Sequence, residues 1–324
     1  MATLKQIRQR IRTSKNIQQI TRAMKLVAAA RLTKAKTRVE EARPYSEKMR
    51  EFMGSIGGAG ELPPHPLLER RPVKKTLLLL VTADRGLAGS YNTNLLRRAG
   101  DWLKAQDGPT ALFCVGKKGS QFFSKRGYEV LGQHSVPTAG AGLDDALHVT
   151  NQVRQLFESG EVDAIYVCYA KFFSPIRQVP QIVQLLPIEP PQSDEPNERI
   201  QSKEYVFEPE PGQLLSLLLP KYLLTVVFQA LLESSASEHG ARMTAMTSAT
   251  DNAGKMIGNL TLTANRVRQA GITKEILEIV GGAEALSQTG AGEEDYLPDH
   301  LLPSHLFPEH PDHRAFSHAQ RGEH

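Results

Sequence analysis

Two long stretches, one at each end of the chain, share an apolar pattern with helical period. Residues 3–43 contain no Pro and no Gly, and their apolar residues recur at spacings of three and four, which indicates an α-helix. The pattern shifts phase once, as a coiled coil tolerates, continues past Pro44 and stops at the glycines of residues 57–60. A second helical pattern covers residues 213–286, with Pro220 near its start, where the first turn of a helix accepts proline best.

The middle of the chain alternates between strand-like and helix-like patterns. Apolar runs with strand character are residues 76–83, 111–116, 128–132 and 164–170, and helical patterns fill residues 90–106, 117–127 and 143–160. Such alternation is typical of an α/β domain with a mainly parallel sheet, so we predict a Rossmann-like α/β fold. A further run, residues 178–187, contains Pro180, which a central strand tolerates poorly, so this run favours an edge strand.

The lengths of the two terminal helices decide how they can be packed. The 66 residues from 221 to 286 contain no Pro and would extend about 100 Å as a helix, whereas helices in globular domains average roughly 11–12 residues. Because the central domain is too small to bury either helix along its length, we expect the helices to pair as an antiparallel coiled coil, to bind another protein, or both. The predicted organisation is a coiled-coil helix at 1–57, an α/β domain at 74–190, a coiled-coil helix at 212–288 and a tail at 291–324.

The tail differs in composition from everything before it. Residues 291–324 hold six of the ten His of the chain and four Pro. Their spacing lacks the fixed helical pairing or the Cys partners of a defined metal site. We therefore predict a disordered His/Pro-rich extension rather than a metal centre.

Charge and cysteine usage narrow the choice of partner and compartment. Residues 1–38 hold eleven Lys or Arg and no Asp or Glu, a block that suits nucleic acid, an anionic membrane surface or an acidic protein. Cys114 and Cys168 each lie in an apolar run, which predicts buried, reduced thiols. The most apolar stretch, residues 214–232, is interrupted by Pro220 and a lysine and is not a clean membrane span, so we expect a soluble, cytoplasmic protein.

One loop resembles a phosphate-binding turn but lacks its essential residues. The sequence ADRGLAGSYN, residues 83–92, follows an apolar run and contains Gly86 and Gly89, yet it fits neither the P-loop nor the dinucleotide-binding pattern. We interpret its glycines as shaping a tight turn from strand to helix. Side chains that could cap the neighbouring helix end are Asp84, Ser90 and Asn92.

No other group of residues forms a candidate active site. Asp144 and Asp145 are adjacent and would point in different directions on a helix, and His134, His148 and His239 have no partner at a matching spacing. The residues therefore predict no catalytic site, no cofactor and no metal.

Four segments resemble one known family. They are IRQRIRTSKNIQQITRAMKLVAAARL, TADRGLAGSYN, ASEHGARMTAMTSATDNA and RQAGITKEILEIVGGAEAL, and they are similar to the gamma subunit of the F-type rotary ATP synthase of bacterial type. The last segment contains the family signature, here Ile272, Thr273, Glu275, Glu278, Gly282 and Ala283. The resemblance covers residues 1 to about 288 in order, and the chain lacks the inserted regulatory cysteine pair of plastid relatives.

The resemblance implies a rotor shaft and a set of partners. In the family, the paired terminal helices stand inside a hexamer of alpha and beta subunits, while the α/β domain outside it holds the epsilon subunit and the membrane c-ring. Proton flow turns the ring and the shaft, and the shaft drives the catalytic beta subunits through their nucleotide-binding states. The chain would then be a non-catalytic subunit without cofactor, peripheral to the cytoplasmic face of the bacterial plasma membrane, with no nucleic acid partner and membrane association only through the complex.

Carried over by position, the resemblance also implies contacts to the beta subunits. Met24 corresponds to a shaft position that touches a moving beta loop, and Arg242, Arg268 and Gln269 correspond to positions that bond to the beta loops catching the shaft. Thr273, Glu275 and Glu278 belong to the signature turn facing the same region. The alternatives are that Met24 is a core position of the coiled coil and that Arg242 and Arg268 form ion pairs within it.

Two other functions compete with the rotor interpretation. One is a nucleotide-binding α/β enzyme with coiled-coil arms, and the other is a nucleic-acid-binding coiled coil built on residues 1–38, although the interleaved aromatic residues of a base-stacking surface are missing there. Both leave the C-terminal signature unexplained.

Overall fold

The computed structural model describes residues 3–58, 64–137, 140–189 and 211–290. Its elements are α1 (Leu4–Gly58), η1 (Pro66–Leu68), β1 (Thr76–Val81), α2 (Tyr91–Lys104), β2 (Thr110–Val115), α3 (Lys117–Ser124), β3 (Glu129–His134), α4 (Leu143–Glu158), β4 (Ala164–Ser174), β5 (Arg177–Leu186) and α5 (Pro211–Gly290). The chain divides into two units, residues 1–261 and 262–324, and each is described by itself. The predicted tail, residues 291–324, lies outside the described residues.

The first unit contains a five-stranded sheet, and its strands follow the order β3-β2-β1-β4-β5. Strands β3, β2, β1 and β4 are parallel, and β5 pairs antiparallel with β4 at the edge. This confirms the predicted α/β fold with a mainly parallel sheet. It also confirms the edge strand, in which Pro180 lies opposite Ala170 and its missing N–H is tolerated.

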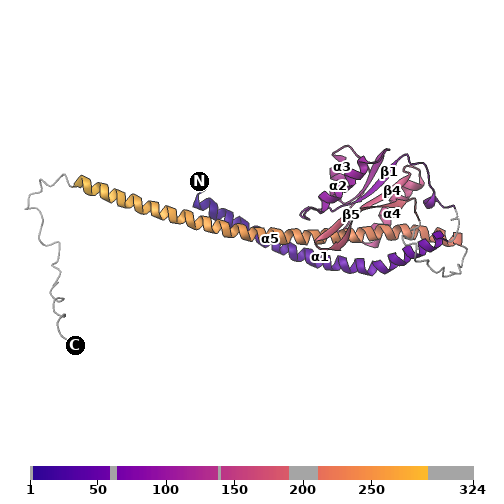
Figure 1. Cartoon of the computed structure of the whole chain (residues 1–324), viewed down its shortest axis with the longest axis horizontal. Coiled ribbons are helices and arrows are strands. Elements are labelled where there is room, and N and C mark those ends of the chain that lie inside the picture. Colours follow the sequence, from indigo (N-terminus) through magenta and orange to yellow (C-terminus); the bar gives the residue numbers. More distant parts are fainter. Residues whose placement is uncertain (1–2, 59–63, 138–139, 190–210, 291–324) are drawn as a thin grey trace, which may run out of the picture. The chain divides into compact units, whose positions relative to one another are not determined.

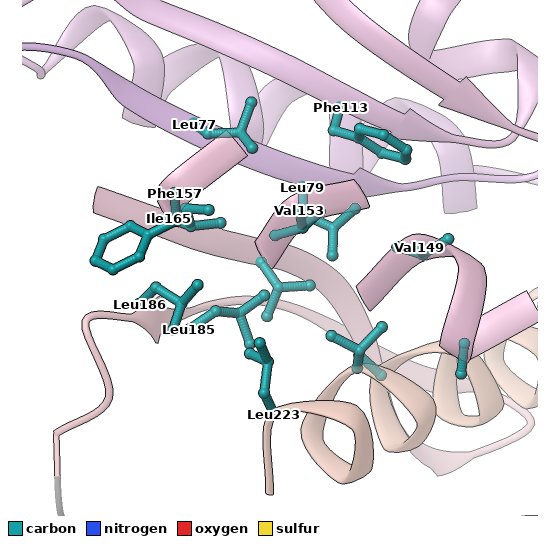
Figure 2. Packing of buried hydrophobic residues seen from close by; sticks show 14 of the residues in the cluster. Leu77, Leu79, Phe113, Val149, Val153, Phe157, Ile165, Leu185, Leu186 and Leu223 are labelled. Atoms are coloured by element: carbon teal, nitrogen blue, oxygen red, sulfur yellow. The ribbon is translucent and has the colours of Figure 1, made fainter. Parts of the chain in front are cut away.

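Alternate residues of each central strand face opposite layers of the domain, as the two-residue period of a strand requires. Leu78 and Leu80 of β1 belong to a core shared with α2 and α3, whereas Leu77 and Leu79 belong to a second core shared with α4 and α5 (Figure 2). Every residue of β1 is therefore buried. That explains why its sequence is continuously apolar rather than alternating.

Helices α1 and α5 run antiparallel to each other within the first unit (Figure 1). Ser14 lies opposite Met256, with 3.5 Å between Oγ and Sδ, and the Thr250 hydroxyl donates to the Thr21 hydroxyl at 2.8 Å. Farther along, the two helices share a small core of Leu32, Ala35, Val39, Leu232 and Ala236. The predicted antiparallel coiled coil is confirmed, and its seam uses small residues that allow close approach.

The N-terminal part of α5 does more than form the coil. Leu215, Leu219, Leu223 and Val227, spaced by four residues, are buried in the core against the sheet. By length and composition α5 is apolar enough to cross a membrane, but this burial accounts for the apolar residues of its first turns. The helix begins at Pro211, so Pro220 lies near its start, as predicted, but in the third turn rather than in the first turn that accepts proline best.

The turn between β4 and β5 packs directly on α5. A Cβ added at Gly240 would lie 3.2 Å from the Pro175 Cα atom, and the Thr244 hydroxyl donates to the Pro175 carbonyl at 2.9 Å. Gly240 therefore permits the close approach that fixes the sheet against the coil.

The described part of the second unit is the last stretch of α5, residues 262–290. Large apolar side chains are exposed along it, namely Leu262, Ile272, Ile276, Leu277, Ile279, Val280 and Leu286. Such a surface on a helix in water indicates that another molecule covers it.

Candidate functional site

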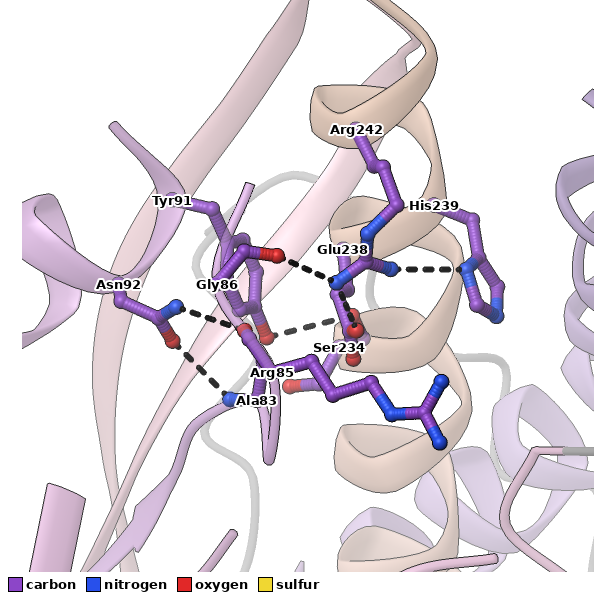
Figure 3. A network of polar contacts seen from close by, with 9 residues as sticks. All are labelled: Ala83, Arg85, Gly86, Tyr91, Asn92, Ser234, Glu238, His239 and Arg242. Carbon is purple, nitrogen blue, oxygen red and sulfur yellow. Dashed lines mark hydrogen bonds and ion pairs between the residues drawn. The ribbon is translucent and has the colours of Figure 1, made fainter. Parts of the chain in front are cut away.

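The loop between β1 and α2 is held on both sides by side chains. The Asn92 side chain accepts a hydrogen bond from the Ala83 N–H at 3.1 Å and donates to the Arg85 carbonyl at 3.5 Å. From the other side, Arg242 of α5 donates to the Gly86 carbonyl at 3.3 Å (Figure 3). The loop thus connects the α/β domain to helix α5.

Two backbone N–H groups at the start of α3, beside this loop, are already bonded within the protein. At the start of α3 the Lys117 N–H donates to the Asp84 carboxylate at 2.9 Å, and the Gly119 N–H donates to the Thr82 hydroxyl at 2.9 Å. Phosphate binding at a helix N-terminus requires free N–H groups. Asp84 therefore caps α3 rather than α2, the helix that follows its own loop, and these two N–H groups are not available to a phosphate.

The conformation of the turn agrees with the prediction at Gly89 but not at Gly86. Positive φ angles occur at Leu87 (62°) and Gly89 (56°), and Gly86 is not among the glycines with positive φ. Ser90 is the N-cap residue of α2 but makes no capping side-chain hydrogen bond. Of the predicted stabilising residues, Asn92 bonds the loop backbone rather than a helix end.

Arg242 is the centre of a small polar network on α5 (Figure 3). Its guanidinium pairs with the Glu238 carboxylate at 2.7 Å and lies 3.4 Å from the His239 Nδ1 atom. Burial raises the pKa of Glu238 even though Arg242 opposes the shift. Burial, and then the positive charges of Arg242 and Arg31, lower the pKa of His239 to about 4. His239 is therefore neutral near neutral pH, so its Nδ1 atom can accept a hydrogen bond from the Arg242 guanidinium.

A cavity of about 530 Å³ opens beside this network, within the first unit. Its walls come from α1, α5, the β1–α2 loop and the loops that follow β2 and β3. Met24 and Arg242 both line it, so the structure brings together two of the predicted site residues that are far apart in the sequence. Met24 is half-buried, and the alternative proposed for Arg242, an ion pair within the shaft, is present as its bond to Glu238.

The remaining predicted site residues lie in the second unit. They are Arg268, Gln269, Thr273, Glu275 and Glu278, all exposed. The Thr273 hydroxyl donates to the Gln269 carbonyl at 3.0 Å, and Glu278 pairs with Lys274 at 3.4 Å. Among the described residues Arg268 forms no ion pair, so its predicted alternative role in a coil salt bridge finds no support.

Comparison with known proteins identifies the family. A family model described as ATP synthase matches residues 3–286. A curated ATP synthase gamma chain of Brevibacillus brevis is 47% identical over 287 residues, which cover 87% of this chain and 98% of the relative. That of Moorella thermoacetica is 45% identical over 88% of this chain and 100% of the relative. The chain belongs to the ATP synthase gamma chain family.

Solved structures agree with this assignment. The central stalk and c-ring structure of the Tetrahymena thermophila mitochondrial ATP synthase contains a chain that is 26% identical, with a TM-score of 0.53 over 71% of this chain and 99% of that one. A chain of the Euglena gracilis mitochondrial enzyme, 19% identical, shares the fold with a TM-score of 0.65 over 91% of this chain and 97% of its own. As a gamma chain, the protein is a subunit of an ATP synthase and functions in its rotary coupling.

Sequence reasoning missed several residues around the gamma-chain site. Glu238 could have been found, because Glu and Arg four residues apart on a helix commonly pair. Ser234 and His239 give no such signal, since their surroundings come from distant elements. His134 also has a partner after all, because its Nε2 atom lies 2.9 Å from the Asp145 carboxylate.

Proposed function

We propose that the chain is the non-catalytic central shaft of a proton-translocating ATP synthase, with its coiled coil standing inside a hexamer of alpha and beta subunits. The α/β domain would hold the epsilon subunit and the c-ring. The complex would lie at the cytoplasmic face of the bacterial plasma membrane, and this chain would associate with the membrane only through the complex.

The exposed apolar surface of the second unit is the observation that carries this proposal. Its seven large apolar side chains are between 45% and 75% exposed, and a helix with such a surface gains free energy when a partner covers it, at about 25 cal/mol per Å² of apolar area. The alpha and beta subunits of a surrounding hexamer would bury these side chains. Because Thr273 and the two signature glutamates share this helix, the surface would also place them near the beta subunits.

Arg242 and Met24 are proposed to contact the moving loops of the beta subunits. The ion pair with Glu238 and the bond to the Gly86 carbonyl fix the Arg242 guanidinium in one orientation, and Met24 lines the same cavity from α1. A contact surface held in this way resists deformation when a beta loop presses on it. Arg268 and Gln269 are proposed to serve the same purpose on the second unit.

Coupling in this proposal needs no reactive group in the chain. A shaft shifts the conformational equilibrium of a beta subunit only by the difference in contact free energy between the states of that subunit. An asymmetric shaft offers each beta subunit a different contact, so turning it changes the three equilibria in sequence. The basic residues of α1 suit acidic loops in the surrounding subunits, because charge attraction acts over distance and tolerates sliding.

A matched pair of substitutions tests whether the second unit is enclosed by the hexamer. Ile279 on α5 is 71% exposed and Ile176 on the β4–β5 turn is 83% exposed. If the hexamer covers only the former, Ile279→Asp reduces co-purification of alpha and beta subunits with the chain, whereas Ile176→Asp leaves it unchanged. Equal recovery of the hexamer with both variants would contradict the proposal.

A further inference from the structure

The cavity beside Arg242 has the size of a small-molecule site. At about 530 Å³ it falls within the range of about 300–1,000 Å³ that is typical of ligand pockets. Rotary coupling assigns it no ligand, and it lies entirely within the first unit.

Much of the cavity wall is apolar. Side chains from α1, β1, the loop after β3 and α5 form this part, represented by Val27, Val81, Val136 and Leu231. Valine and leucine walls favour a hydrocarbon or aromatic body, since such a body leaves water on entering. A small, strongly hydrated ion alone would leave this part of the cavity unused.

The charged groups at the cavity leave a surplus of positive charge. The Asp84 carboxylate accepts bonds from the Lys117 N–H and the Ser135 hydroxyl, and Glu238 is paired with Arg242. Arg31 and Arg85 also line the cavity, and neither guanidinium forms an ion pair with any residue that the structure describes.

The histidine at the cavity, His239, adds no charge to this surplus near neutral pH. The positive charges of Arg242 and Arg31, after burial, lower the pKa of His239. Arg242 and Arg31 thus both contribute positive charge near His239, and an anion would be attracted to this part of the cavity wall.

A buried hydroxyl without a partner adds an independent sign of a ligand. Ser234 lines the cavity and is 3% exposed, and its Oγ atom completes no hydrogen bond of ordinary geometry with a described residue, the neighbouring Tyr91 hydroxyl included. Its carbonyl, in contrast, accepts a bond from the Tyr91 hydroxyl at 3.3 Å (Figure 3). Buried polar atoms are almost always paired, because leaving one unpaired costs about 1–3 kcal/mol.

We propose that this cavity binds a small amphiphilic carboxylate. Its alkyl or aryl body would lie among the apolar side chains, and its carboxylate would be attracted by Arg31 and Arg85. One carboxylate oxygen would accept the hydrogen bond that the Ser234 hydroxyl does not make within the protein.

The proposal is tested by titrating the purified full-length chain with dansyl-labelled undecanoate and following the dansyl fluorescence. The expected result is saturable binding at one site, reversed by decanoate but not by decanol, which has a similar chain length and no charge. Absence of saturable binding, or equal displacement by the two competitors, would overturn the proposal. Alpha and beta subunits are absent from this measurement, so its outcome is independent of the rotor function.

Matched variants locate the bound carboxylate. Val27→Trp, which reduces the cavity, is expected to weaken binding about tenfold or more, while Leu26→Trp at the neighbouring position, which does not line the cavity, should leave binding unchanged. Arg31→Gln is expected to weaken binding by about tenfold, as loss of a charged hydrogen bond predicts, while Arg22→Gln on the same helix has no effect. Equal effects within either pair would place the probe elsewhere and overturn the assignment.

Ser234→Ala separates a binding role from a structural one. Because the hydroxyl has no partner in the protein, removing it should leave the urea unfolding midpoint unchanged or raise it, yet weaken probe binding severalfold. Unchanged probe affinity in this variant would overturn the role proposed for Ser234.

Discussion

At the scale of single residues, Arg242 connects the shaft with the α/β domain. It pairs with a largely buried glutamate on its own helix and bonds the carbonyl of Gly86 in a loop more than 150 positions earlier in the chain. Removing one partner of a buried ion pair leaves the other charge uncompensated, which is more costly than the pair is favourable. Arg242 is therefore a point where a single substitution acts on both local stability and contact geometry.

Arg242→Ala is expected to lower coupled ATP turnover of the assembled complex by roughly tenfold, the factor that corresponds to about 1.4 kcal/mol of lost contact free energy. The complex should still assemble, because the apolar surfaces of the shaft are unchanged. Turnover of the purified complex is the measurement, and Arg97→Ala, an exposed arginine on α2, is the control. A mutant complex with wild-type rates would contradict the role of Arg242.

His239 makes the stability of the first unit depend on pH. Its pKa is about 4 in the folded chain against an ordinary value of 6.5, so between these values the unfolded chain binds the proton more tightly. The stability due to neutral His239 is present above pH 6.5 and is lost as the pH falls toward 4, by up to about 3 kcal/mol. The raised pKa of Glu238 acts in the opposite direction.

Comparison with a His239→Gln variant isolates the histidine contribution from that of Glu238. Urea unfolding measured from neutral pH down to about pH 4 should show a smaller loss of stability in the variant than in the wild type. Parallel pH profiles for the two proteins would show that His239 is not the titrating group.

The sequence could predict individual site residues only where a motif or a local spacing marked them. Met24 and Arg242 were predicted as site residues because they lie in segments that resemble the family. The Glu238–Arg242 ion pair could be expected because the two residues are four positions apart on a helix. The surroundings of His239 and Ser234 were not predictable, because Arg31 and Tyr91 reach them from elements far away in the chain. Their unusual properties depend on tertiary packing, which a sequence pattern does not contain.

At the scale of elements, the apolar patterns predicted helices and strands well but not the details of turns. All five strands and the two long helices were expected, whereas the left-handed conformation falls on Leu87 rather than Gly86. The conformation of a turn depends on which of its backbone groups form hydrogen bonds. Here Asn92 and Arg242 form those hydrogen bonds with the backbone of the loop. The turn after β2 is the most constrained, because Gly116 has φ of 91° and an added Cβ would lie 2.1 Å from the Thr82 carbonyl oxygen.

Gly116→Ala is therefore expected to destabilise the first unit by about 2–4 kcal/mol, since both the backbone conformation and the contact with Thr82 oppose a side chain. Gly86→Ala is the matched control, because nothing lies within 4 Å of its added Cβ, and its effect should stay within about 0.5 kcal/mol. Urea midpoints of the full-length chain measure both. Similar midpoints for the two variants would contradict the account of this turn.

At the scale of the whole molecule, the chain combines a packed α/β domain with helical surface that only partners can cover. Both terminal helices are longer than the α/β domain can bury. This length explains why α1 pairs with α5 and why apolar residues of the second unit are exposed. Length and periodicity therefore predicted the architecture, and the family signature predicted the complex. The identity of each subunit that touches each surface stays a prediction.

Deletion of residues 291–324 is expected to leave assembly and ATP hydrolysis of the complex within about twofold of the wild type. The physical reason is compositional, since the predicted disordered tail carries neither a packed core pattern nor a defined metal site. Sedimentation of the complex and its hydrolysis rate are the measurements. Loss of either property would show that the tail has an essential role.

Rotation of this chain inside a hexamer tests the central claim most directly. Cys114 and Cys168 are buried, and burial raises the pKa of both thiols to about 12. A cysteine introduced by Ser124→Cys, at an exposed position of α3, can therefore be labelled selectively. With alpha and beta subunits immobilised, a bead attached at this cysteine should turn in one direction when ATP is added, with one pause for each beta subunit. ATP hydrolysis by the same complex without any turning of the bead would contradict the account.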